Sequence, residues 1–335
     1  MAIRVVLVGL GPIGAAVAGQ LLERKGFQIV GAVDIDPLKV GKDAGEVMEL
    51  GRRLRLKVTD TIGKTIKATR PDVAVLCTSS SLKRVMPQFE EVLKHHVPIV
   101  STTEEAAYPS PANRSLVKRL DEAARKAKVA VLATGVNPGF VMDALPIALT
   151  AMCARVDRVE VHRVQDARVR RLPFQQKIGA GLTQEQFKRG VDNGTLRHVG
   201  FTESTHMIAS ALGWKLERVI DDIKPKMADH PVASELLAVD PGYVCGIIQD
   251  GIGYVKGEPR IRLHLEAYLG APESYDSVLI EGSPRIYSKI DGGVHGDIAT
   301  ASMTVNSIAP VIAAAPGFRT MREMRLPSFS ASATA

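Results

Sequence analysis

Cysteine is scarce in this sequence. Its 335 residues include only three cysteines, Cys77, Cys153 and Cys245, and they lie far apart. An odd and scattered set argues against a disulfide framework and against a cysteine-based zinc site. His, Asp and Glu form no group with metal-ligand spacing either, so we expect no metal. Cys77 lies inside an apolar run, which favours core packing over a role as nucleophile.

Aromatic residues are also few, at 4% of the chain. The formal net charge of +7 raises the question of nucleic-acid binding. The basic residues are dispersed in short clusters, however, and few aromatic side chains are present to stack on bases. We therefore expect a solvated basic surface that favours small anionic ligands, and no nucleic-acid partner.

Long hydrophobic runs are missing. No apolar stretch reaches the roughly 18 residues that a membrane-spanning helix requires. The first residues already form an apolar segment typical of a core strand, so no signal peptide is expected. Hydrophobic residues at 45% and charged residues at 24% are typical of a globular protein. We expect a cytoplasmic protein with no membrane partner, long enough to form two domains.

A glycine-rich turn stands near the start of the chain. Residues 9–14 (GLGPIG) follow the apolar run 3–8 and precede a helical segment over 15–22. A buried strand that enters a helix through such a turn points backbone N–H groups at a pyrophosphate. The first glycine permits the tight turn, the second lets a phosphate approach the backbone, and the third lets the helix pack on the strand. We therefore predict that a dinucleotide binds to Gly9, Gly11, Pro12, Ile13 and Gly14.

A carboxylate follows at the distance expected for a ribose ligand. A second predicted strand, 27–33, ends at Asp34, which lies 20 residues after Gly14. Such a carboxylate accepts hydrogen bonds from the adenine ribose hydroxyls and repels a 2′-phosphate. No arginine directly follows it, although Lys39 and Lys42 lie close in sequence. The sequence therefore favours NAD as the cofactor and leaves NADP open.

The first 140 residues alternate apolar strands with helices. Further strands are predicted over 73–79, 97–102 and 129–135, with helices over 82–95 and 113–128. This alternation predicts an α/β fold with a Rossmann-type, doubly wound parallel sheet. Ligands bind such sheets at the carboxyl ends of the strands. One cleft is therefore expected to be bordered by Gly9, Asp34, Ser79, Thr103 and Val136, and we count Ser79 and Thr103 among the cofactor-binding residues.

The pattern changes after residue 140. Segments 158–164 and 260–266 alternate polar and apolar residues, as in strands with one covered and one solvated face. We expect residues 141–297 to form a second, α+β domain on a mixed or antiparallel open sheet, which binds substrate and provides a dimerisation surface. A C-terminal helical segment, 298–320, is expected to pack back on the dinucleotide-binding domain, residues 1–140.

Two adjacent acids follow the strand predicted over 97–102. A carboxylate near a helix N-terminus can simply complement the helix dipole, and we expect this of Glu105. For Glu104 we expect chemistry. A carboxylate that faces the nicotinamide, in a cleft from which water is partly removed, can hold an ammonium, accept its proton and stabilise an iminium as hydride moves. An acid at this place suits a nitrogen cation better than a developing alkoxide.

Several further residues are candidates for the site. Asn137 lies in the sequence Asn-Pro-Gly, which strongly favours a turn. We expect this turn to act as a hinge, to contact the nicotinamide carboxamide, or both. Phe140 and Met142 are expected to line an apolar substrate pocket. His198 and His264 are histidine candidates for the same pocket, with a structural role for His198 and a solvated position for His264 as the alternatives.

Taken together, these segments resemble a known family. The first half resembles the N-terminal domain of dihydrodipicolinate reductases, and the whole chain is similar to the 2,4-diaminopentanoate dehydrogenases and native amine dehydrogenases. The resemblance covers nearly the full length, and its later motifs are more specific than the glycine turn. It rests on residues 9–14, 101–105 (STTEE), 135–140 (GVNPGF), 176–182 (QKIGAGL), 197–200 (RHVG), 211–214 (ALGW) and 292–299 (GGVHGDIA).

This resemblance implies reversible oxidative deamination of a small amine or diamino acid to a ketone, which in reverse is reductive amination with ammonia. It implies that Glu104 contacts the reacting nitrogen and that two copies form a homodimer. Thr103 departs from the cysteine that relatives often carry at this position, which affects the shape of the pocket and leaves the acid in place.

Four other assignments stay open at this point. Dihydrodipicolinate reductases carry a His-His-x-x-x-Lys type segment in their second domain, whereas here the only His-His pair, 95–96, lies in the first half. Sugar dehydrogenases of this architecture carry Glu-Lys-Pro where this chain has Glu-Glu-Ala at 104–106. Another Rossmann oxidoreductase would act on a small carbonyl or imine. A non-catalytic dinucleotide sensor would keep the glycine turn and Asp34 and have no need for Glu104.

Overall fold

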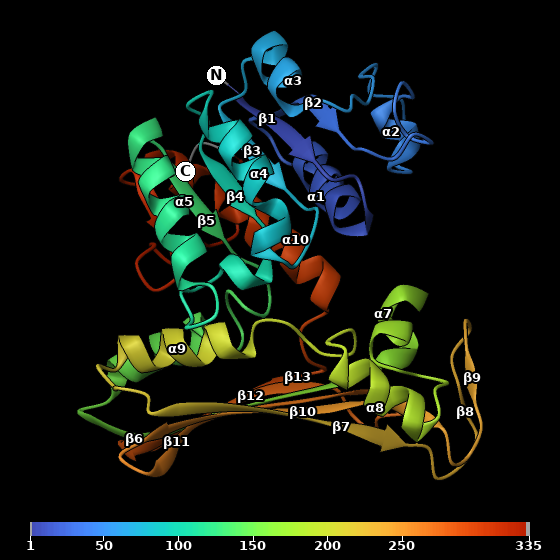
Figure 1. Ribbon diagram of the computed structural model, residues 1–335, viewed down its shortest axis with the longest axis vertical. Helices are drawn as coiled ribbons and strands as arrows, with labels where there is room; N and C mark the ends of the chain where they lie inside the picture. Colours follow the sequence, from blue (N-terminus) through green and yellow to red (C-terminus); the bar gives the residue numbers. More distant parts are fainter. Residues whose placement is uncertain (1, 333–335) are drawn as a thin grey trace. The chain divides into compact units, whose positions relative to one another are not determined.

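The computed structural model describes residues 2–332. The chain forms two compact units, each built on a six-stranded sheet (Figure 1). The first unit contains the residues up to Phe140 together with those from His295 onward. The second unit contains Val141–Val294. None of the helices in residues 2–332 has the length and hydropathy of a membrane-spanning segment.

The sheet of the first unit is parallel throughout. Every neighbouring pair of strands runs in the same direction, in the order β14-β5-β4-β3-β1-β2. The central strands are almost completely buried apolar runs, as expected where helices cover both faces of a parallel sheet. The strands are β1 (Ile3–Val8), β2 (Phe27–Val33), β3 (Val73–Leu76), β4 (Ile99–Ser101), β5 (Ala130–Ala133) and β14 (Gly317–Arg319).

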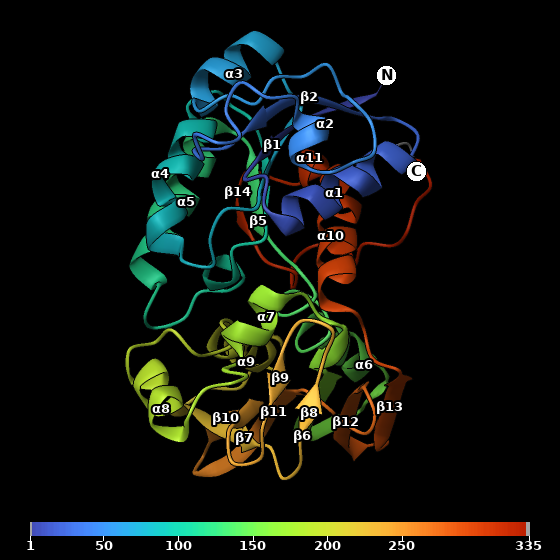
Figure 2. The same cartoon turned by 90° about the vertical axis from the view of Figure 1, so that its right-hand side faces the viewer.

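Helices cover both faces of this sheet, with α4 and α5 on one side and α1 and α10 on the other (Figure 2). The apolar face of α4 places Leu82, Val85 and Phe89 in the core beneath the strands. The helices of this unit are α1 (Pro12–Glu23), α2 (Ala44–Val47), α3 (Ile62–Thr69), α4 (Leu82–Leu93), α5 (Arg114–Ala127), α10 (Gly296–Asn306) and α11 (Ile308–Ala313), with the 3-10 turn η1 (Glu104–Ala106).

The C-terminal part of this unit differs from the sequence-based expectation. The segment 298–320 belongs to the first unit as expected, but it forms two helices, α10 and α11, and then strand β14, which pairs with β5. Pro316 and Gly317, which has a positive φ of 123°, turn the chain from helix into strand. Helix α10 packs on α1, where the Gln20 side chain donates to Ser302 Oγ at 3.0 Å.

The sheet of the second unit is mixed, as predicted. Its order is β13-β12-β6-β11-β10-β7, and only the β6–β11 pair is parallel. The strands are β6 (Arg155–Asp166), β7 (Arg218–Met227), β10 (Val244–Val255), β11 (Glu258–Tyr268), β12 (Tyr275–Ser283) and β13 (Ile286–Asp291). A separate two-stranded ribbon is formed by β8 (Val232–Ala233) and β9 (Ala238–Val239).

Helices lie on one face of this second sheet (Figure 1). Helix α9 packs so closely that a Cβ on Gly251 would lie 2.8 Å from the Phe201 ring, and one on Gly253 would lie 2.7 Å from the Thr205 methyl carbon. We call this the inner face and the opposite one the outer face. The helical elements of the unit are α6 (Ala144–Leu149), η2 (Thr150–Met152), η3 (Ala167–Val169), α7 (Leu172–Lys177), α8 (Gln184–Asp192) and α9 (Phe201–Ala211).

Candidate active site

The glycine turn joins β1 to α1 with little space for side chains. Gly9 has φ of +88°, and a Cβ there would lie 2.6 Å from the Cys77 carbonyl oxygen. A Cβ on Gly14 would lie 2.1 Å from the carbonyl oxygen of Gly9. A Cβ on Gly11, in contrast, would meet nothing within 4 Å. The fold therefore requires Gly9 and Gly14, whereas Gly11 borders open space beside a helix N-terminus, the place where a phosphate group fits.

Asp34 follows β2 and is held against this turn. Its Oδ2 accepts hydrogen bonds from the Leu10 backbone N–H at 2.9 Å and from Lys39 Nζ at 2.9 Å. Its Oδ1 accepts from the Asp36 backbone N–H at 3.0 Å. Burial raises the pKa of the Asp34 carboxyl, but the hydrogen bond from Lys39 and those from the two backbone groups outweigh it, so the pKa lies below its ordinary value. The carboxylate is thus ionised at neutral pH and fixed in position.

Other predicted cofactor residues follow the neighbouring strands. Strand β1 lies between β2 and β3, so the order of strands reverses here, as at a ligand-binding crevice in doubly wound sheets. Ser79 is half-buried, and its Oγ accepts from the Ser81 backbone N–H at 3.2 Å. Thr103 and Asn137 are buried, and the Thr103 hydroxyl lies 2.9 Å from Ser101 Oγ. Because all strands are parallel, the structure brings these residues to one edge of the sheet.

Glu104 begins the turn η1 directly after β4, and the surrounding contacts anchor this turn. The Glu105 backbone N–H donates to the Ser80 carbonyl at 3.2 Å. Glu105 Oε2 accepts from the backbone N–H of Leu82, the first residue of α4, at 2.9 Å. Asn113 Nδ2 donates to the Glu105 carbonyl at 2.6 Å. The backbone that carries the half-buried Glu104 side chain is therefore held between α4 and α5.

These contacts also decide between the two acids. Glu105 was expected to complement a helix that follows it in sequence, whereas its carboxylate lies at the N-terminus of α4, which precedes it in sequence. Cys77 is half-buried, and loss of hydration raises the pKa of its thiol to about 12, which argues against a role as nucleophile. Within residues 2–332, no three or more His, Cys, Asp or Glu side chains are arranged to hold a metal ion.

In the second unit, His198 is held on the inner face of the sheet. Its backbone N–H donates to Gln249 Oε1 at 2.8 Å, and Gln249 Nε2 donates to the His198 carbonyl at 3.0 Å and to Asp221 Oδ1 at 2.8 Å. Loss of hydration, together with the positive charges of Lys177 and Arg163, lowers the pKa of His198 to about 3. The neutral ring contacts the Val199 carbonyl through Nδ1 at 3.0 Å, so Nδ1 carries the proton and Nε2 is an acceptor.

His264 lies on the other face. Its Nδ1 contacts Asp250 Oδ1 at 2.9 Å and its Nε2 contacts Glu266 Oε1 at 3.0 Å. Gln249 pairs with Leu265, the residue after His264, and successive side chains of a strand point to opposite faces. The expectation that His198 and His264 share one pocket is therefore wrong.

Phe140 and Met142, the two residues expected to line an apolar pocket, belong to different units. The boundary between the units falls between Phe140, which is half-buried, and Met142, which is fully buried.

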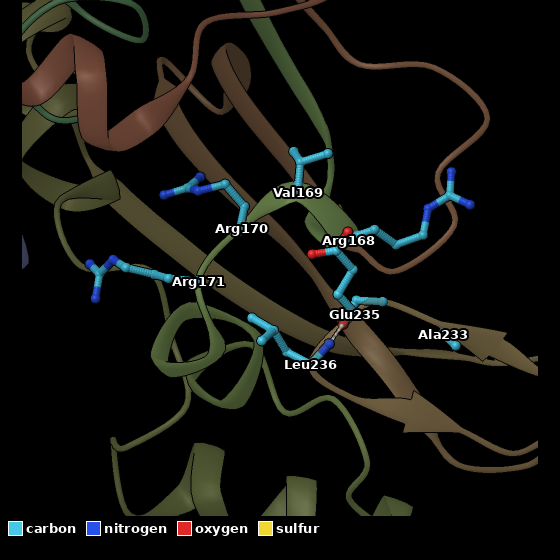
Figure 3. A pocket seen from close by; sticks show the side chains of 8 residues that line it. Arg168, Val169, Arg170, Arg171, Ala233, Glu235 and Leu236 are labelled. Atoms are coloured by element: carbon cyan, nitrogen blue, oxygen red, sulfur yellow. Dashed lines mark hydrogen bonds between the residues drawn. The ribbon is translucent and has the colours of Figure 1, made fainter.

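A basic pocket of about 750 Å³ opens beside the loop that connects β6 to α7 (Figure 3). The Arg170 guanidinium lies 4.0 Å from the centre of the Phe174 ring, and its Nη1 donates to Gln165 Oε1 at 2.9 Å. Arg168 is paired with Asp166, and in Figure 3 it points away from Arg170. The charge of this lining suits an anionic group. The pocket is lined by Arg168, Val169, Arg170, Arg171, Ala233, Ser234, Glu235 and Leu236.

Sequence reasoning missed a buried ion pair on the inner face. Arg163 Nη1 lies 3.3 Å from Asp276 Oδ1, and both side chains are almost completely buried. Burial raises the pKa of Asp276 and lowers that of Arg163. One feature of the sequence indicates that Arg163 is buried. It lies two and four residues after Val161 and Val159, so in a strand its side chain points to the same buried face as theirs. Its partner on β12 follows only from the pairing of strands.

The fold and the glycine turn define a Rossmann-type oxidoreductase. The family model described as "Dihydrodipicolinate reductase, N-terminus" matches residues 3–134, and the one described as "2,4-diaminopentanoate dehydrogenase C-terminal domain" matches residues 140–334. The chain is 34% identical to a 2,4-diaminopentanoate dehydrogenase of Acetoanaerobium sticklandii, an alignment that covers 97% of this chain and 94% of the relative. The chain therefore belongs to the 2,4-diaminopentanoate dehydrogenase family, which confirms the resemblance seen in the sequence.

Two amine dehydrogenases extend this comparison. One, from Streptomyces virginiae, is 24% identical over 93% of this chain and 91% of its own length. The structure of the other, from Mycobacterium smegmatis, superposes with a TM-score of 0.88 at 25% identity and covers 99% of this chain and 98% of that one. Both units of the fold thus have counterparts in an amine dehydrogenase.

Proposed function

We propose that this protein is an NAD(P)-dependent amine dehydrogenase. It oxidises a small amine or diamino acid to a ketone and, in reverse, aminates the ketone with ammonia. The names of the relatives support this activity. The observation that carries the proposal is the position of Glu104, on an anchored turn at the carboxyl edge of a dinucleotide-type sheet.

The residues of the first unit fit a dinucleotide. Gly9, Gly11 and Gly14, with Pro12 and Ile13 at the start of α1, hold the pyrophosphate in this proposal. Asp34 binds the adenine ribose, and its negative charge favours NAD. Ser79, Thr103 and Asn137 lie toward the nicotinamide, which supplies the hydride acceptor when bound.

Glu104 acts on the substrate nitrogen. Its carboxylate holds the substrate ammonium and accepts a proton from it, so that the neutral amine can release hydride from its carbon. Once Glu104 has passed this proton on to solvent, its restored carboxylate stabilises the iminium cation, which water hydrolyses to the ketone and ammonia. In the direction of reductive amination, Glu104 returns the proton to the amine that forms.

The substrate proposed for this site carries a carboxylate. The diamino acid in the name of the relative that is 34% identical supports this choice. In this proposal the half-buried Phe140 contacts the apolar part of the substrate. A comparison of 4-aminopentanoate with 2-aminopentane, which carries a methyl group in place of the carboxylate, tests this. Equal kcat/KM values would exclude recognition of the carboxylate.

The substitution Glu104→Gln tests the catalytic role. We expect amine-dependent NADH formation to fall by about 100-fold or more, because a general base contributes that much, while NADH affinity is retained. Glu105→Gln is the matched control and should keep turnover, because an amide oxygen can still accept from the Leu82 N–H. Normal turnover of Glu104→Gln would show that Glu104 is not the catalytic carboxylate. No turnover of any ketone with high ammonium would favour the dinucleotide sensor.

The homodimer and the cytoplasmic location remain predictions. The outer face of the second sheet, with Ile220 among its exposed side chains, is the surface that we propose for contact between two copies. Light scattering coupled to size-exclusion chromatography measures the mass directly. A monomer at micromolar concentration would remove the dimer from the proposal.

A further inference from the structure

We propose that a cavity beside α5 is a second ligand site, which binds a small phosphate monoester that carries an aromatic ring. The cavity has a volume of about 320 Å³, enough for one ring with a phosphate group. Its walls come from α5, from the chain that follows η1, and from β14, which lies beside α5 at the edge of the parallel sheet (Figure 2). All lining residues belong to the first unit, and none is proposed above for the dinucleotide or the substrate. The inference therefore does not depend on the proposed activity.

Basic side chains outnumber acidic ones in the lining of this cavity. Asp121, one of its two acids, already has partners, since Oδ2 accepts from Arg125 Nε at 2.7 Å and Oδ1 accepts from the Phe318 backbone N–H at 2.9 Å. Burial raises the pKa of the Asp121 carboxyl, but these hydrogen bonds outweigh it, so the pKa lies below its ordinary value. The lining contains the four basic residues Arg114, Lys118, Arg125 and Arg322 and the two acids Asp121 and Glu323. This excess of positive charge favours an anionic ligand.

Arg114 and Lys118 are the cations that we assign to the phosphate. They are four residues apart on α5, so they lie on the same side of the helix, and both are exposed. Lys118 Nζ lies 3.9 Å from Glu122 Oε1, an exposed pair that water weakens. A guanidinium group binds phosphate through two parallel hydrogen bonds, and an ammonium adds a second positive charge. A phosphate monoester, with close to two negative charges at neutral pH, matches this pair of cations.

The uncharged part of the lining is mostly apolar. Tyr108 and Pro109 are half-buried, and they provide flat surfaces on which an aromatic ring can pack. Val117 and Phe318 are almost completely buried and add further apolar contacts. Thr320 also lines the cavity, and its buried hydroxyl has no hydrogen-bond partner among the residues that the structure describes. A buried polar group of this kind calls for a partner, which a bound ligand can supply.

Asn113 connects the wall of the cavity to the turn that carries Glu104. Its Nδ2 donates to the Tyr108 carbonyl at 3.2 Å and to the Glu105 carbonyl at 2.6 Å. A substitution of Tyr108 would therefore disturb the proposed catalytic turn as well as the cavity. The exposed residues of α5 are the better choice for a test, because their substitution leaves these contacts in place.

Isothermal titration calorimetry with phenyl phosphate tests the inference without a turnover assay. Saturating NADH is present, so that the groups proposed to bind its phosphates do not take up the probe. We expect the wild-type protein to bind phenyl phosphate, and the double variant Arg114→Gln, Lys118→Gln to bind it about tenfold more weakly or worse, because two charge-assisted contacts are lost. Lys126→Gln is the matched control, since Lys126 is an exposed cation of the same helix outside the cavity, and it should retain the affinity. Inorganic phosphate, which lacks the ring, and benzoate, which lacks the second charge, should both bind more weakly than phenyl phosphate.

The outcomes separate this inference from the proposed function. No binding of phenyl phosphate by the wild-type protein at millimolar concentration would overturn it. Equal affinities of the wild type and the double variant, with folding of both checked by circular dichroism, would also overturn it, because the probe would then bind elsewhere. Inorganic phosphate or benzoate binding as tightly as phenyl phosphate would overturn the class of ligand. Failure of the protein to bind NADH would remove the proposed function, and the same titrations without NADH would still test the cavity.

Discussion

The backbone N–H of Leu10 donates a hydrogen bond to the Asp34 carboxylate at 2.9 Å, across a separation of 24 residues. This bond ties the glycine turn after β1 to the end of β2. The groups proposed to bind the pyrophosphate and the adenine ribose therefore belong to one rigid element of the first unit.

Replacement of Asp34 by Ala removes the acceptor for two backbone N–H groups and for Lys39. We expect a loss of stability of about 1–3 kcal/mol, because the Leu10 and Asp36 donors lose their partner. NADH affinity should fall, and the ratio of NADPH to NADH affinity should rise about tenfold as the repulsion of phosphate disappears. Urea unfolding and nucleotide titration measure the two effects. An unchanged ratio would refute the role of Asp34 in cofactor choice.

Alanine substitutions at two glycines of the same turn should differ in their effects on stability and on NADH affinity. Gly14→Ala places a methyl group 2.1 Å from the Gly9 carbonyl oxygen, so we expect a loss of at least about 1–3 kcal/mol of stability. Gly11→Ala meets no neighbouring atom, so its cost should stay below about 1 kcal/mol. The Gly11 variant should nevertheless lose NADH affinity, because its methyl group occupies the space proposed for the phosphate. Normal NADH binding by a folded Gly11→Ala variant would contradict this assignment.

His198 makes the stability of the protein depend on pH. Its pKa is lowered from 6.5 to about 3 in the folded state, so the unfolded chain binds more protons between these values. The contribution of the neutral ring is complete above pH 6.5 and is lost as the pH falls toward 3, at up to about 1.4 kcal/mol per pH unit.

His198→Gln isolates this contribution, because glutamine does not titrate. The stability difference between wild type and variant should shift by about 2 kcal/mol, against the wild type, between pH 7 and pH 5. Urea unfolding at both pH values measures it. An identical difference at both pH values would show that the ring is not held in its neutral form.

A buried hydrogen bond supports the start of α6. Ser204 Oγ donates to Asp143 Oδ2 at 2.7 Å, and both side chains are completely buried. Ser204→Ala removes this donor, and we expect a loss of about 1–3 kcal/mol in thermal or urea unfolding.

Thr205→Val is the matched control on the same helix. The Thr205 hydroxyl bonds to the Phe201 carbonyl of its own helix, and valine keeps the shape of the side chain. The cost of this substitution should be about 1 kcal/mol or less. Equal costs for the two variants would show that the contact with Asp143 adds nothing specific.

The sequence predicted those parts of the site that depend on neighbours in the chain. The strand, turn and helix around Gly9–Gly14, and the strand that ends at Asp34, follow from local patterns of hydrophobicity and from glycine conformation. The strand ends of a parallel sheet meet at one edge, so the placement of Ser79 and Glu104 there followed as well. The mixed sheet of the second unit was predicted because alternation reports one covered face.

The tertiary structure decided which groups these side chains and strands contact. Glu105 caps α4, Arg163 faces Asp276, and β14 joins the first sheet beside β5. His198 and His264 occupy opposite faces of one sheet, although both had been predicted for the same pocket.

The amino-acid sequence by itself determined the family, the glycine turn and the acids at the strand ends, because periodicity and glycine content act within a few residues. Only the tertiary structure decided that Lys39 sits on the Asp34 carboxylate and that Asp276 receives a buried arginine. Local patterns show which face a residue occupies. The identity of the group opposite depends on loop conformation and on which strands become neighbours, and folding of the whole unit settles both.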